Sequence, residues 1–465
     1  MKKRLYPGAF EEPGELAPLA QEILRRNDMG GWTKAAPDLY PHQWSWDSAF
    51  IALGLAHIDV RRAAEELRTL FAHQWKTGKI PHIVFNLDAP PESYFPGAEH
   101  WASASPDAPD APLMPSPTSG LCQPPVHAMA ARHIWEVARE QGGEKLEETR
   151  TFLQEIYPKL LAWHRYLATT RDPEESGLVT IYHPWESGTD NSPRWNAALD
   201  RVTVGEMPPH PRPDLDGVTD HSQRPTQEKY DRYIWLVELI KRARCEEVAI
   251  YGYHPFLVKD VFFSAILVRA NEALLEIAEV VDAPDEERST MRRWIQRGRR
   301  GLEEHWDPEL KLCLDYDLRA GEPLRARTVG GFAPLIAGGG DPGQLEALLE
   351  VLDSPTFLGN PDLRWPLPPS TSPEDPEFDP RRYWRGPVWP VYNWLLWWSL
   401  IQVGEHERAE RLRQSSLEQV AVGGFGEYFE PFTGELLGSD NQSWTAAVVL
   451  DWLANGPQPE AVEAS

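Results

Sequence analysis

Amphipathic helical segments occur along nearly the whole chain and constrain its fold most. Between residues 15 and 27, Leu16, Leu19, Ile23 and Leu24 fall on one face of a helix. The same spacing recurs in residues 60–75, 126–141, 146–168, 227–244, 255–281, 286–304, 344–352, 388–403, 407–422 and 441–453. Strand patterns are few, and the best of them, residues 311–318, is short. The sequence therefore predicts an all-α protein of about a dozen helices.

Long connections rich in proline, glycine and tryptophan separate these helices, with proline-rich stretches at residues 103–117, 208–213 and 366–380. Loops of this length in a compact domain are usually functional. No fixed-period repeat is visible, which counts against a helical solenoid, and no low-complexity linker divides the chain. We predict that residues 1–465 form one (α/α)6 toroid or barrel with a few short strands. Loop insertions at about residues 85–120 and 205–225 are expected to cover its site.

Charge and composition exclude several classes of partner. The net charge is −25, and such a surface repels phosphate backbones, so we expect no nucleic-acid partner. An anionic small substrate would need a basic residue inside its site. The longest apolar stretch, residues 388–401, is too short to span a bilayer, so we expect no membrane insertion. The three cysteines are widely spaced and indicate free thiols, and no apolar segment follows the basic start, so we expect a cytoplasmic protein.

Two carboxylates lie in aromatic, glycine-containing segments far apart in the chain. Asp190 belongs to His-Pro-Trp-Glu-Ser-Gly-Thr-Asp-Asn-Ser and Glu427 to Gly-Gly-Phe-Gly-Glu-Tyr-Phe-Glu-Pro. Hydrolysis of an acetal needs one acid to protonate the leaving oxygen and a second carboxylate to act on water or on the anomeric carbon. The neighbouring Trp and Tyr side chains provide flat faces for a pyranose ring. This pattern indicates a glycosidase.

Other chemistries fit the sequence poorly. Residues 338–343 match GxGxxG by letter, but no strand–helix crossover frames them and Pro342 removes a needed N–H group. The turn with Asp214, Asp216 and Asp220 has ligands suited to calcium, yet acidic turns of this kind usually hold none. The 14 histidines are scattered without metal-ligand spacing. We therefore expect no cofactor and no metal in the site, and whether the chain binds a structural divalent cation stays open.

Four motifs, in order along the chain, resemble glycoside hydrolase family 63. They are Leu-Tyr-Pro-His-Gln-Trp-Ser-Trp-Asp at 39–47, the Asp190 segment at 183–192, Tyr-Trp-Arg-Gly-Pro-Val-Trp at 383–389 and Gly-Glu-Tyr-Phe-Glu-Pro-Phe-Thr-Gly at 426–434. The closest likeness is to its short bacterial members that hydrolyse mannosylglycerate and glucosylglycerate. The resemblance extends over residues 15–455. It implies an (α/α)6 barrel and an inverting mechanism.

Carried onto this chain, the resemblance makes Asp190 the general acid and Glu427 the general base. Asp190 must then be protonated near neutral pH, which requires apolar surroundings such as Trp185 and Trp195 would give. Glu427 must stay ionised and hold a water on the other face of the ring. Glu186 is the alternative to Asp190, and Glu430 is the alternative to Glu427.

The resemblance also implies the residues that bind the substrate. Arg224 and Tyr230 resemble the segment that grips the glycerate carboxylate, which an arginine fork matches bidentately. The alternative for Arg224 is a surface pair with Glu228. Asp47 is either a helix N-cap or a ligand of sugar hydroxyls. The remaining predicted binding residues are Tyr40, Gln43, Trp44, Trp46, Tyr94, Gly120, Gln123, Trp185, Gly188, Tyr383, Trp384 and Gln442.

These observations together predict an inverting α-glycosidase. Its expected substrates are 2-O-α-mannosyl-D-glycerate, 2-O-α-glucosyl-D-glycerate or both, which it would hydrolyse to sugar plus D-glycerate in the recycling of compatible solutes. A related trehalase or an α-glucosidase for small oligosaccharides is the alternative enzyme. A sugar-binding protein without catalysis is the alternative of another class. The expected partner is a small anionic glycoside, and homo-oligomerisation stays open.

Overall fold

The computed structural model describes residues 15–37, 39–103, 108–112, 117–216 and 220–456. Its longer helices are α1 (Leu16–Asn27), α2 (Ser45–Ala56), α3 (Val60–Phe71), α5 (His127–Gln141), α6 (Gly143–Arg165), α9 (Gln227–Arg242), α11 (Val261–Val280), α12 (Asp285–Glu304), α14 (Pro342–Asp353), α15 (Pro390–Gln402), α16 (His406–Gly423) and α17 (Ser443–Ala454). The shorter helices are α4 (Ala98–Trp101), α7 (Asn196–Asp200), α8 (Pro213–Asp216), α10 (Glu247–Tyr253) and α13 (Ala333–Ile336).

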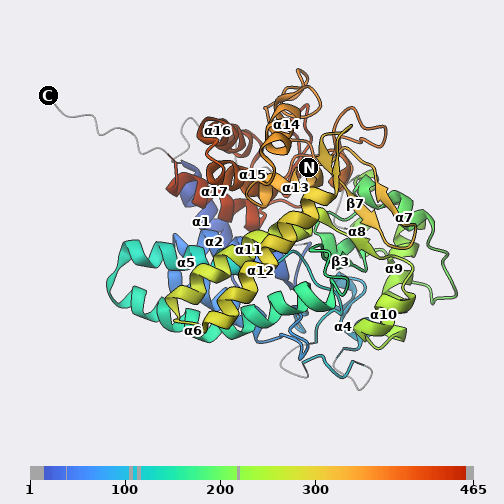
Figure 1. The fold of residues 1–465 in the computed structure, drawn as a ribbon, viewed down its shortest axis with the longest axis horizontal. Helices are drawn as coiled ribbons and strands as arrows, with labels where there is room; N and C mark the ends of the chain where they lie inside the picture. The colour runs from blue at the N-terminus through green and yellow to red at the C-terminus, as the bar shows by residue number, and fades with distance from the viewer. Residues whose placement is uncertain (1–14, 38, 104–107, 113–116, 217–219, 457–465) are drawn as a thin grey trace.

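Six helices form a closed inner ring in the described part of the chain. Each packs against the next in the order α2, α5, α11, α13, α15, α17, and α17 returns to α2. The outer helices α1, α3, α6, α12, α14 and α16 alternate with them along the chain and pack on the outside of the ring. Along the chain an outer helix follows each inner helix and leads to the next one, which is the alternation expected of an (α/α)6 barrel. Figure 1 shows one such pair, α11 and α12, side by side. The predicted (α/α)6 fold is confirmed.

The inner helices are apolar almost all round because neighbours cover them on every side. Every residue of α2 is buried, and α15 and α17 are buried along nearly their whole length. Helix α2 therefore has no amphipathic stripe, which is why the sequence pattern did not reveal it. The amphipathic outer helices were predicted within a few residues, as for α3 and α12. Asp59 caps α3 by accepting from the Arg61 N–H.

Short strands lie in the connections between helices. They are β1 (Gln43–Trp44), β2 (Ile83–Val84), β3 (Thr180–Ile181), β4 (Val258–Lys259), β5 (Trp306–Asp307), β6 (Leu312–Cys313), β7 (Asp315–Asp317), β8 (Glu322–Leu324), β9 (Tyr428–Phe429) and β10 (Leu436–Leu437). β3, β4, β7 and β8 form an antiparallel sheet in that order, with Thr180 opposite Lys259 and Val258 opposite Asp317. β1 pairs with β2, β5 with β6 and β9 with β10. The predicted strand at 311–318 is thus β6 and β7, in two different sheets.

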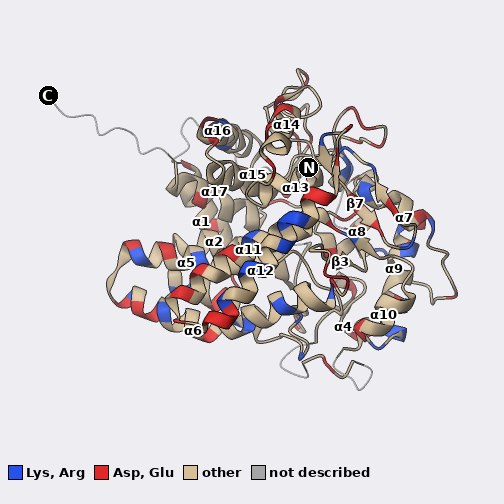
Figure 2. Cartoon of the chain, in the orientation of Figure 1, with Lys and Arg blue, Asp and Glu red and all other residues tan. Residues whose placement is uncertain are grey.

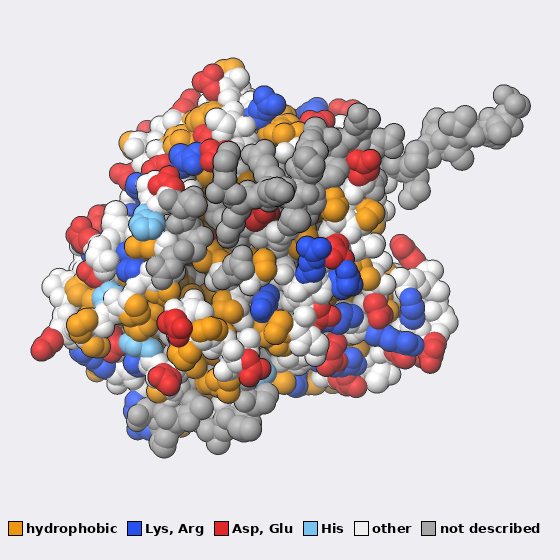
Figure 3. Space-filling view, turned by 180° about the vertical axis from the view of Figure 1, so that it is seen from behind, with side chains coloured by type: hydrophobic (Ala, Val, Ile, Leu, Met, Phe, Trp, Pro, Cys, Tyr) orange, Lys and Arg blue, Asp and Glu red, His pale blue; other side chains and the backbone are white. Residues whose placement is uncertain are grey.

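The connections that precede the inner helices gather at one end of the barrel. Figure 1 shows α7, α8, α9, α10 and the β3–β7 sheet on its right, away from the turn between α5 and α6 on the left. Charged residues lie mainly on outer helices such as α6 and α12, whereas α15 and α17 are almost free of them (Figure 2). On the described part of the opposite face, acidic, basic and apolar side chains are interspersed (Figure 3). No helix in the described ranges is long and apolar enough to cross a membrane.

Candidate active site

A cavity opens at the end of the barrel where the inner helices begin. It encloses about 910 Å³ of empty space, including the open solvent at its mouth. Its walls come from segments at the N-terminal ends of inner helices. Asp47 lies in the first turn of α2, and Gln123, Tyr383 and Gln442 precede α5, α15 and α17, respectively. The barrel topology therefore brings together residues that are hundreds of positions apart.

Asp190 lies in the wall of this cavity on a tightly fixed loop. The Trp195 indole N–H donates to the Thr189 carbonyl (3.1 Å), and Arg194 Nη1 donates to Thr189 Oγ1 (3.2 Å). Arg194 is buried and also pairs with Asp260 and Asp315 at 2.6 Å each. The backbone next to Asp190 is thus fixed to the N-terminus of α11 and to β7. Trp195, expected to shield Asp190 directly, instead holds its loop from outside the cavity.

The setting of Asp190 favours its protonated form. Burial is the main cause that raises the pKa of this carboxyl, from an ordinary 3.8 to about 7, and the negative charge of Glu427 adds to the shift. Arg224 opposes the shift. A carboxyl group that is protonated near neutral pH is able to give its proton to a leaving oxygen.

Glu427 is almost fully buried, with 1 % of its surface exposed, and is held by donors on both carboxylate oxygens. Oε1 accepts from the Tyr40 hydroxyl at 2.8 Å and from the Tyr383 hydroxyl at 3.4 Å. Oε2 accepts from the Ser439 N–H at 3.0 Å. Gly438, which has a φ of +70°, passes so close that any Cβ there would collide with Oε2. These donors fix the orientation of both carboxylate oxygens.

The two alternative carboxylates lie outside the cavity lining. Glu186 is fully buried in a bidentate pair with Arg171, whose Nη1 and Nη2 both approach it to 2.8 Å. Burial alone would raise the pKa of Glu186, but the Arg171 guanidinium outweighs it and holds the pKa at about 2. Glu430 closes the turn between β9 and β10, where its Oε2 accepts from the Phe432 N–H (2.9 Å) and the Thr433 hydroxyl (2.6 Å). Both groups have structural partners.

Asp47 is a third carboxyl group in the cavity. It lies in the first turn of α2 and is not the N-cap, a position that Trp44 occupies. Burial, followed by the nearby charges of Glu427 and Asp190, raises its pKa well above the ordinary value. Beside it, the ring of Trp46 packs over Gly188, where φ is +70° and a Cβ would lie 2.7 Å from the indole. Asp47 lines the cavity and does not cap the helix, so its carboxyl group is available to a ligand in the cavity.

Aromatic side chains form one side of the cavity. The Trp44 ring meets those of Tyr40 and Tyr94 edge to face, with centroids 5.6 Å and 5.2 Å away. Trp185 continues this wall toward Tyr230, whose hydroxyl donates to the Phe95 carbonyl at 3.1 Å. Such a wall covers the apolar face of a sugar ring and leaves its hydroxyls to polar groups.

Arg224 is the basic residue that the acidic chain requires in an anion site. It is 7 % exposed, lines the cavity, and its guanidinium lies 5.1 Å from the centre of the Tyr383 ring. Its Nε and Nη2 have no hydrogen-bond partner among the residues that the structure describes. Glu228, the expected surface partner, pairs instead with Arg232 at 2.9 Å. The surface-pair alternative for Arg224 is therefore wrong.

Several other donors in the cavity wall also lack partners. They are the indole N–H groups of Trp44 and Trp444, the Tyr233 hydroxyl, His82 Nε2 and Gln442 Nε2. The Gln442 side chain is oriented by its Oε1, which accepts from the Ser439 hydroxyl at 2.6 Å. Buried polar groups normally find partners, so a cluster of unpartnered ones facing a cavity indicates a polar ligand.

Most of the predicted site residues meet in this cavity, and three do not. Lining it are Tyr40, Trp44, Trp46, Asp47, Tyr94, Gln123, Trp185, Gly188, Asp190, Arg224, Tyr230, Tyr383, Glu427 and Gln442. Gln43 instead contacts Ser48 and Glu66, and Trp384 stacks on Trp389 with centroids 4.0 Å apart. Gly120 lies against Trp101, and its carbonyl accepts from Lys79 at 2.9 Å.

The structure adds lining residues that the sequence did not indicate: His82, Phe95, Pro213, Asp214, Pro225, Tyr233 and Trp444. Asp214 was considered only as a calcium ligand, but both its oxygens accept from Arg212, at 2.8 Å and 2.7 Å. Asp220 Oδ1 accepts a hydrogen bond from the Ser222 N–H group. The Asp216 side chain lies outside the described residues. The glycine-rich segment at 338–343 starts α14, where Asp341 accepts from the Gly343 and Gln344 N–H groups.

Comparison with known proteins identifies the family. The family model described as the mannosylglycerate hydrolase MGH1-like glycoside hydrolase domain matches residues 40–445. The chain belongs to this family. Family membership makes it a glycoside hydrolase, and the family 63 resemblance expected from the motifs is confirmed.

Two relatives are similar over nearly their whole lengths. A glucosylglycerate hydrolase from Mycolicibacterium hassiacum is 47 % identical over 443 residues, which cover 95 % of this chain and 98 % of that protein. A mannosylglycerate hydrolase from Thermus thermophilus is 41 % identical over 439 residues, or 93 % and 99 % of the two chains.

Solved structures show the same similarity. The family 63 mannosylglycerate hydrolase from Thermus thermophilus, in complex with Tris and D-glycerate, has a TM-score of 0.85 at 40 % identity and covers 94 % of this chain and 100 % of its own. Neutral trehalase from Saccharomyces cerevisiae has a TM-score of 0.52 at 13 % identity, covering 90 % and 73 %. That second likeness concerns the fold alone.

Proposed function

We propose that this glycoside hydrolase is an inverting α-glycosidase for 2-O-α-glucosyl-D-glycerate, 2-O-α-mannosyl-D-glycerate or both. The names of its relatives support this substrate class. The observation that carries the proposal is Arg224, a buried cation whose Nε and Nη2 have no partner among the described residues and which lines a cavity with four carboxyl groups. Within a chain of charge −25, an uncharged aglycone would give such an arginine no partner.

The proposed reaction follows from the two carboxyl environments. Asp190, protonated because burial raises its pKa, gives its proton to the oxygen between sugar and glycerate. Glu427, oriented by Tyr40 and the Ser439 N–H, takes a proton from a water that attacks the anomeric carbon from the opposite face. The glycosidic C–O bond breaks as the new C–O bond forms, so the configuration at that carbon inverts. D-glycerate leaves with its hydroxyl restored.

In this proposal the sugar and the glycerate contact different walls of the cavity. Trp44, Trp46, Asp47 and Gln442 would bind the sugar, whereas Arg224 with the segment around Tyr230 would hold the glycerate carboxylate. Residues from both predicted insertions, such as Phe95 and Pro213, contribute to the lining. This supports one catalytic domain whose insertions cover the site. The free thiols of Cys122, Cys245 and Cys313 support the expected reducing, cytoplasmic compartment.

A trehalase is less well supported, because its uncharged aglycone would offer no carboxylate to the Nε and Nη2 donors of Arg224, which have no partner among the described residues. One experiment separates the possibilities: the protein is incubated separately with glucosylglycerate, mannosylglycerate and trehalose while proton NMR follows the released sugar. We expect release from a glycosylglycerate, with the β anomer appearing first. Release from trehalose alone would refute the substrate class, and early α anomer would refute inversion. Binding without release would indicate a sugar-binding protein.

A further inference from the structure

A second cluster of polar side chains lies at the end of the barrel opposite the cavity. The inner helices α2, α13, α15 and α17 contain only two charged residues, Asp47 and Asp451. Asp47 belongs to the candidate active site, but Asp451 is in the last turn of α17 and is 2 % exposed. At about 1.5 Å rise per residue, the C-terminal end of α2 is roughly 15 Å from Asp47. The proposed hydrolysis therefore gives Asp451 no role.

Two histidines converge on Asp451. His57 follows the C-terminus of α2, and its Nε2 lies 2.8 Å from Asp451 Oδ1. His133, on α5, places its Nε2 at 3.3 Å from the same oxygen and at 3.2 Å from His57 Nε2. The carboxylate is itself oriented, because the Trp394 indole N–H donates to Oδ2 at 2.7 Å and Asn455 Nδ2 donates to Oδ1 at 2.9 Å.

Hydrogen bonds alone satisfy this triangle only in part: if His57 donates to the carboxylate, His133 Nε2 either brings a second proton to the same place or turns a lone pair toward the carboxylate oxygen. Each imidazole Nε2 has one position in the ring plane, which holds either a proton or a lone pair. If both nitrogens donate to Asp451, their protons face each other across 3.2 Å. If His133 donates to His57, His57 has no proton left for the carboxylate. A cation at the centre would let both lone pairs and the carboxylate oxygen point to the same place.

The dimensions of the triangle match a metal site. Zinc binds imidazole nitrogen at about 2.0–2.1 Å and carboxylate oxygen at about 2.0–2.2 Å, so neighbouring ligands in a tetrahedron lie roughly 3.3 Å apart, and in an octahedron roughly 3.0 Å. The observed edges are 2.8, 3.2 and 3.3 Å. We propose that His57, His133 and Asp451 bind a first-row transition-metal dication, with zinc as the expected ion.

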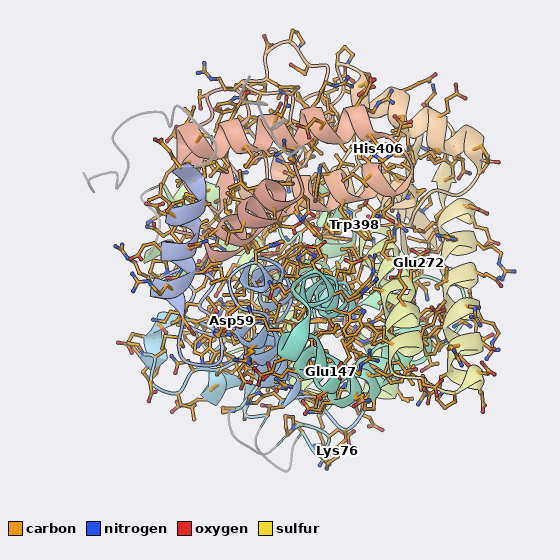
Figure 4. All side chains as sticks on the ribbon, turned by 90° about the vertical axis from the view of Figure 1, so that its left-hand side faces the viewer. Asp59, Lys76, Glu147, Glu272, Trp398 and His406 are labelled. Atoms are coloured by element: carbon orange, nitrogen blue, oxygen red, sulfur yellow. The ribbon has the colours of Figure 1, made fainter. Side chains whose placement is uncertain are left out.

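Ligand chemistry selects this class of ion. Imidazole nitrogen suits zinc, cobalt and nickel, whereas magnesium and calcium prefer oxygen ligands. His133 and Asp451 line a cavity that Glu136, Gln402 and Trp398 also line in part, and this cavity has room for water ligands. Trp398, one of the residues that line this cavity, is labelled in Figure 4, which views the molecule from the side of the α5–α6 turn. The ion would join α2, α5 and α17, three helices of the inner ring, far from the reacting atoms, so its role is structural.

The sequence does not reveal this site because its ligands are far apart in the chain. His57 and His133 are 76 residues apart, and His57 and Asp451 are 394 apart. Short ligand spacings are the usual sequence signature of a zinc site, and none exists here. The sequence therefore leaves a structural cation open.

Titration with cobalt(II) after dialysis against a chelator tests the proposal on the full-length protein. Bound to two imidazoles and a carboxylate, the ion should give visible absorption bands that saturate at about one equivalent per chain and vanish when zinc is added. Zinc should raise Tm. Magnesium should neither remove the cobalt bands nor raise Tm. Absence of the cobalt bands in the unmutated protein would overturn the proposal without any variant.

Variants assign the ligands. His57→Gln and His133→Gln should each abolish the cobalt bands and the zinc-induced rise in Tm, with folding checked by circular dichroism. Asn455→Ala removes the hydrogen bonds that Asn455 Nδ2 donates to the carboxylate and to the backbone carbonyl of Asp451, and it should weaken zinc binding by about 10–100-fold while the bands remain. His305→Gln is the matched control and should change neither. Bands that persist in both ligand variants would place the ion elsewhere and refute the site.

Discussion

Replacing Arg224 by alanine tests the proposed substrate most directly, because it separates an anionic from a neutral aglycone. The guanidinium lines the cavity with Nε and Nη2 unpartnered, so a carboxylate would gain charge-assisted hydrogen bonds there. Such bonds contribute about 1.5–3 kcal/mol. At about 1.4 kcal/mol per tenfold, kcat/KM for glycosylglycerate should fall by roughly one to two orders of magnitude.

The assay compares glycosylglycerate with the corresponding glycosylglycerol, which lacks the carboxylate. Arg224 also acts on Glu427 and Asp190, but those effects are common to both substrates, so the ratio of the two kcat/KM values isolates the glycerate contact. Arg224→Lys should recover only part of the loss, because a point charge does not reproduce the planar fork. Arg381→Ala, which removes a surface pair with Glu435, is the control and should leave the ratio unchanged.

Stability provides the second readout for the same variant. Arg224 is buried and forms no salt bridge with the described residues, and the desolvation that its removal relieves outweighs the loss of its longer-range attraction to Glu427, so its removal should not lower Tm. Equal losses on charged and neutral substrates, together with a lower Tm, would mean that Arg224 holds the fold. In that case the reasoning about the glycerate carboxylate would be wrong.

Two further predictions concern the acid and the base. Glu427→Gln should lower kcat by about a hundredfold to ten-thousandfold, whereas Glu430→Gln, which affects a turn, should retain turnover; the opposite pattern would make Glu430 the base. Because Asp190 acts in its protonated form and its pKa is about 7, kcat/KM should decline as pH rises above about 7. Arg224 lowers the pKa of Asp190, so Arg224→Ala should move this decline to higher pH, and a decline that stays in place would argue against Asp190 as the acid.

The outer half of the fold could be predicted from sequence, and the inner half only in part. Outer helices have one solvent-exposed face, so their apolar residues recur with helical periodicity in the sequence, as in α3. α2 is buried on every side and has no such period. α13 is only four residues long, too short for a periodic pattern. The ring was therefore expected from the number of helices and from the family resemblance.

Motifs located the candidate site but did not always give the direction of each side chain. Gln43 and Trp44 are neighbours in β1, and because successive strand residues point to opposite faces, Trp44 lines the cavity while Gln43 turns to Glu66. His82 and Tyr233 lie in segments without a recognisable motif, and they reach the cavity only through tertiary packing. A sequence pattern shows neither the direction of a side chain nor which distant residues pack together.

In the proposed mechanism, the environments of Asp190 and Glu427 would let two ordinary carboxyl groups take opposite parts in one reaction. Glu427 accepts hydrogen bonds from Tyr40 and from the Ser439 N–H, which fix the orientation of its carboxylate oxygens. For Asp190 burial is the largest influence, and the charge of Glu427 adds to it, so the ionised base itself favours the protonated acid. An anionic substrate would add a further negative charge beside both groups, and Arg224 lies where it can compensate for it. The arginine would then do more than select the glycerate, because it would let an anion enter a cavity that already holds a carboxylate.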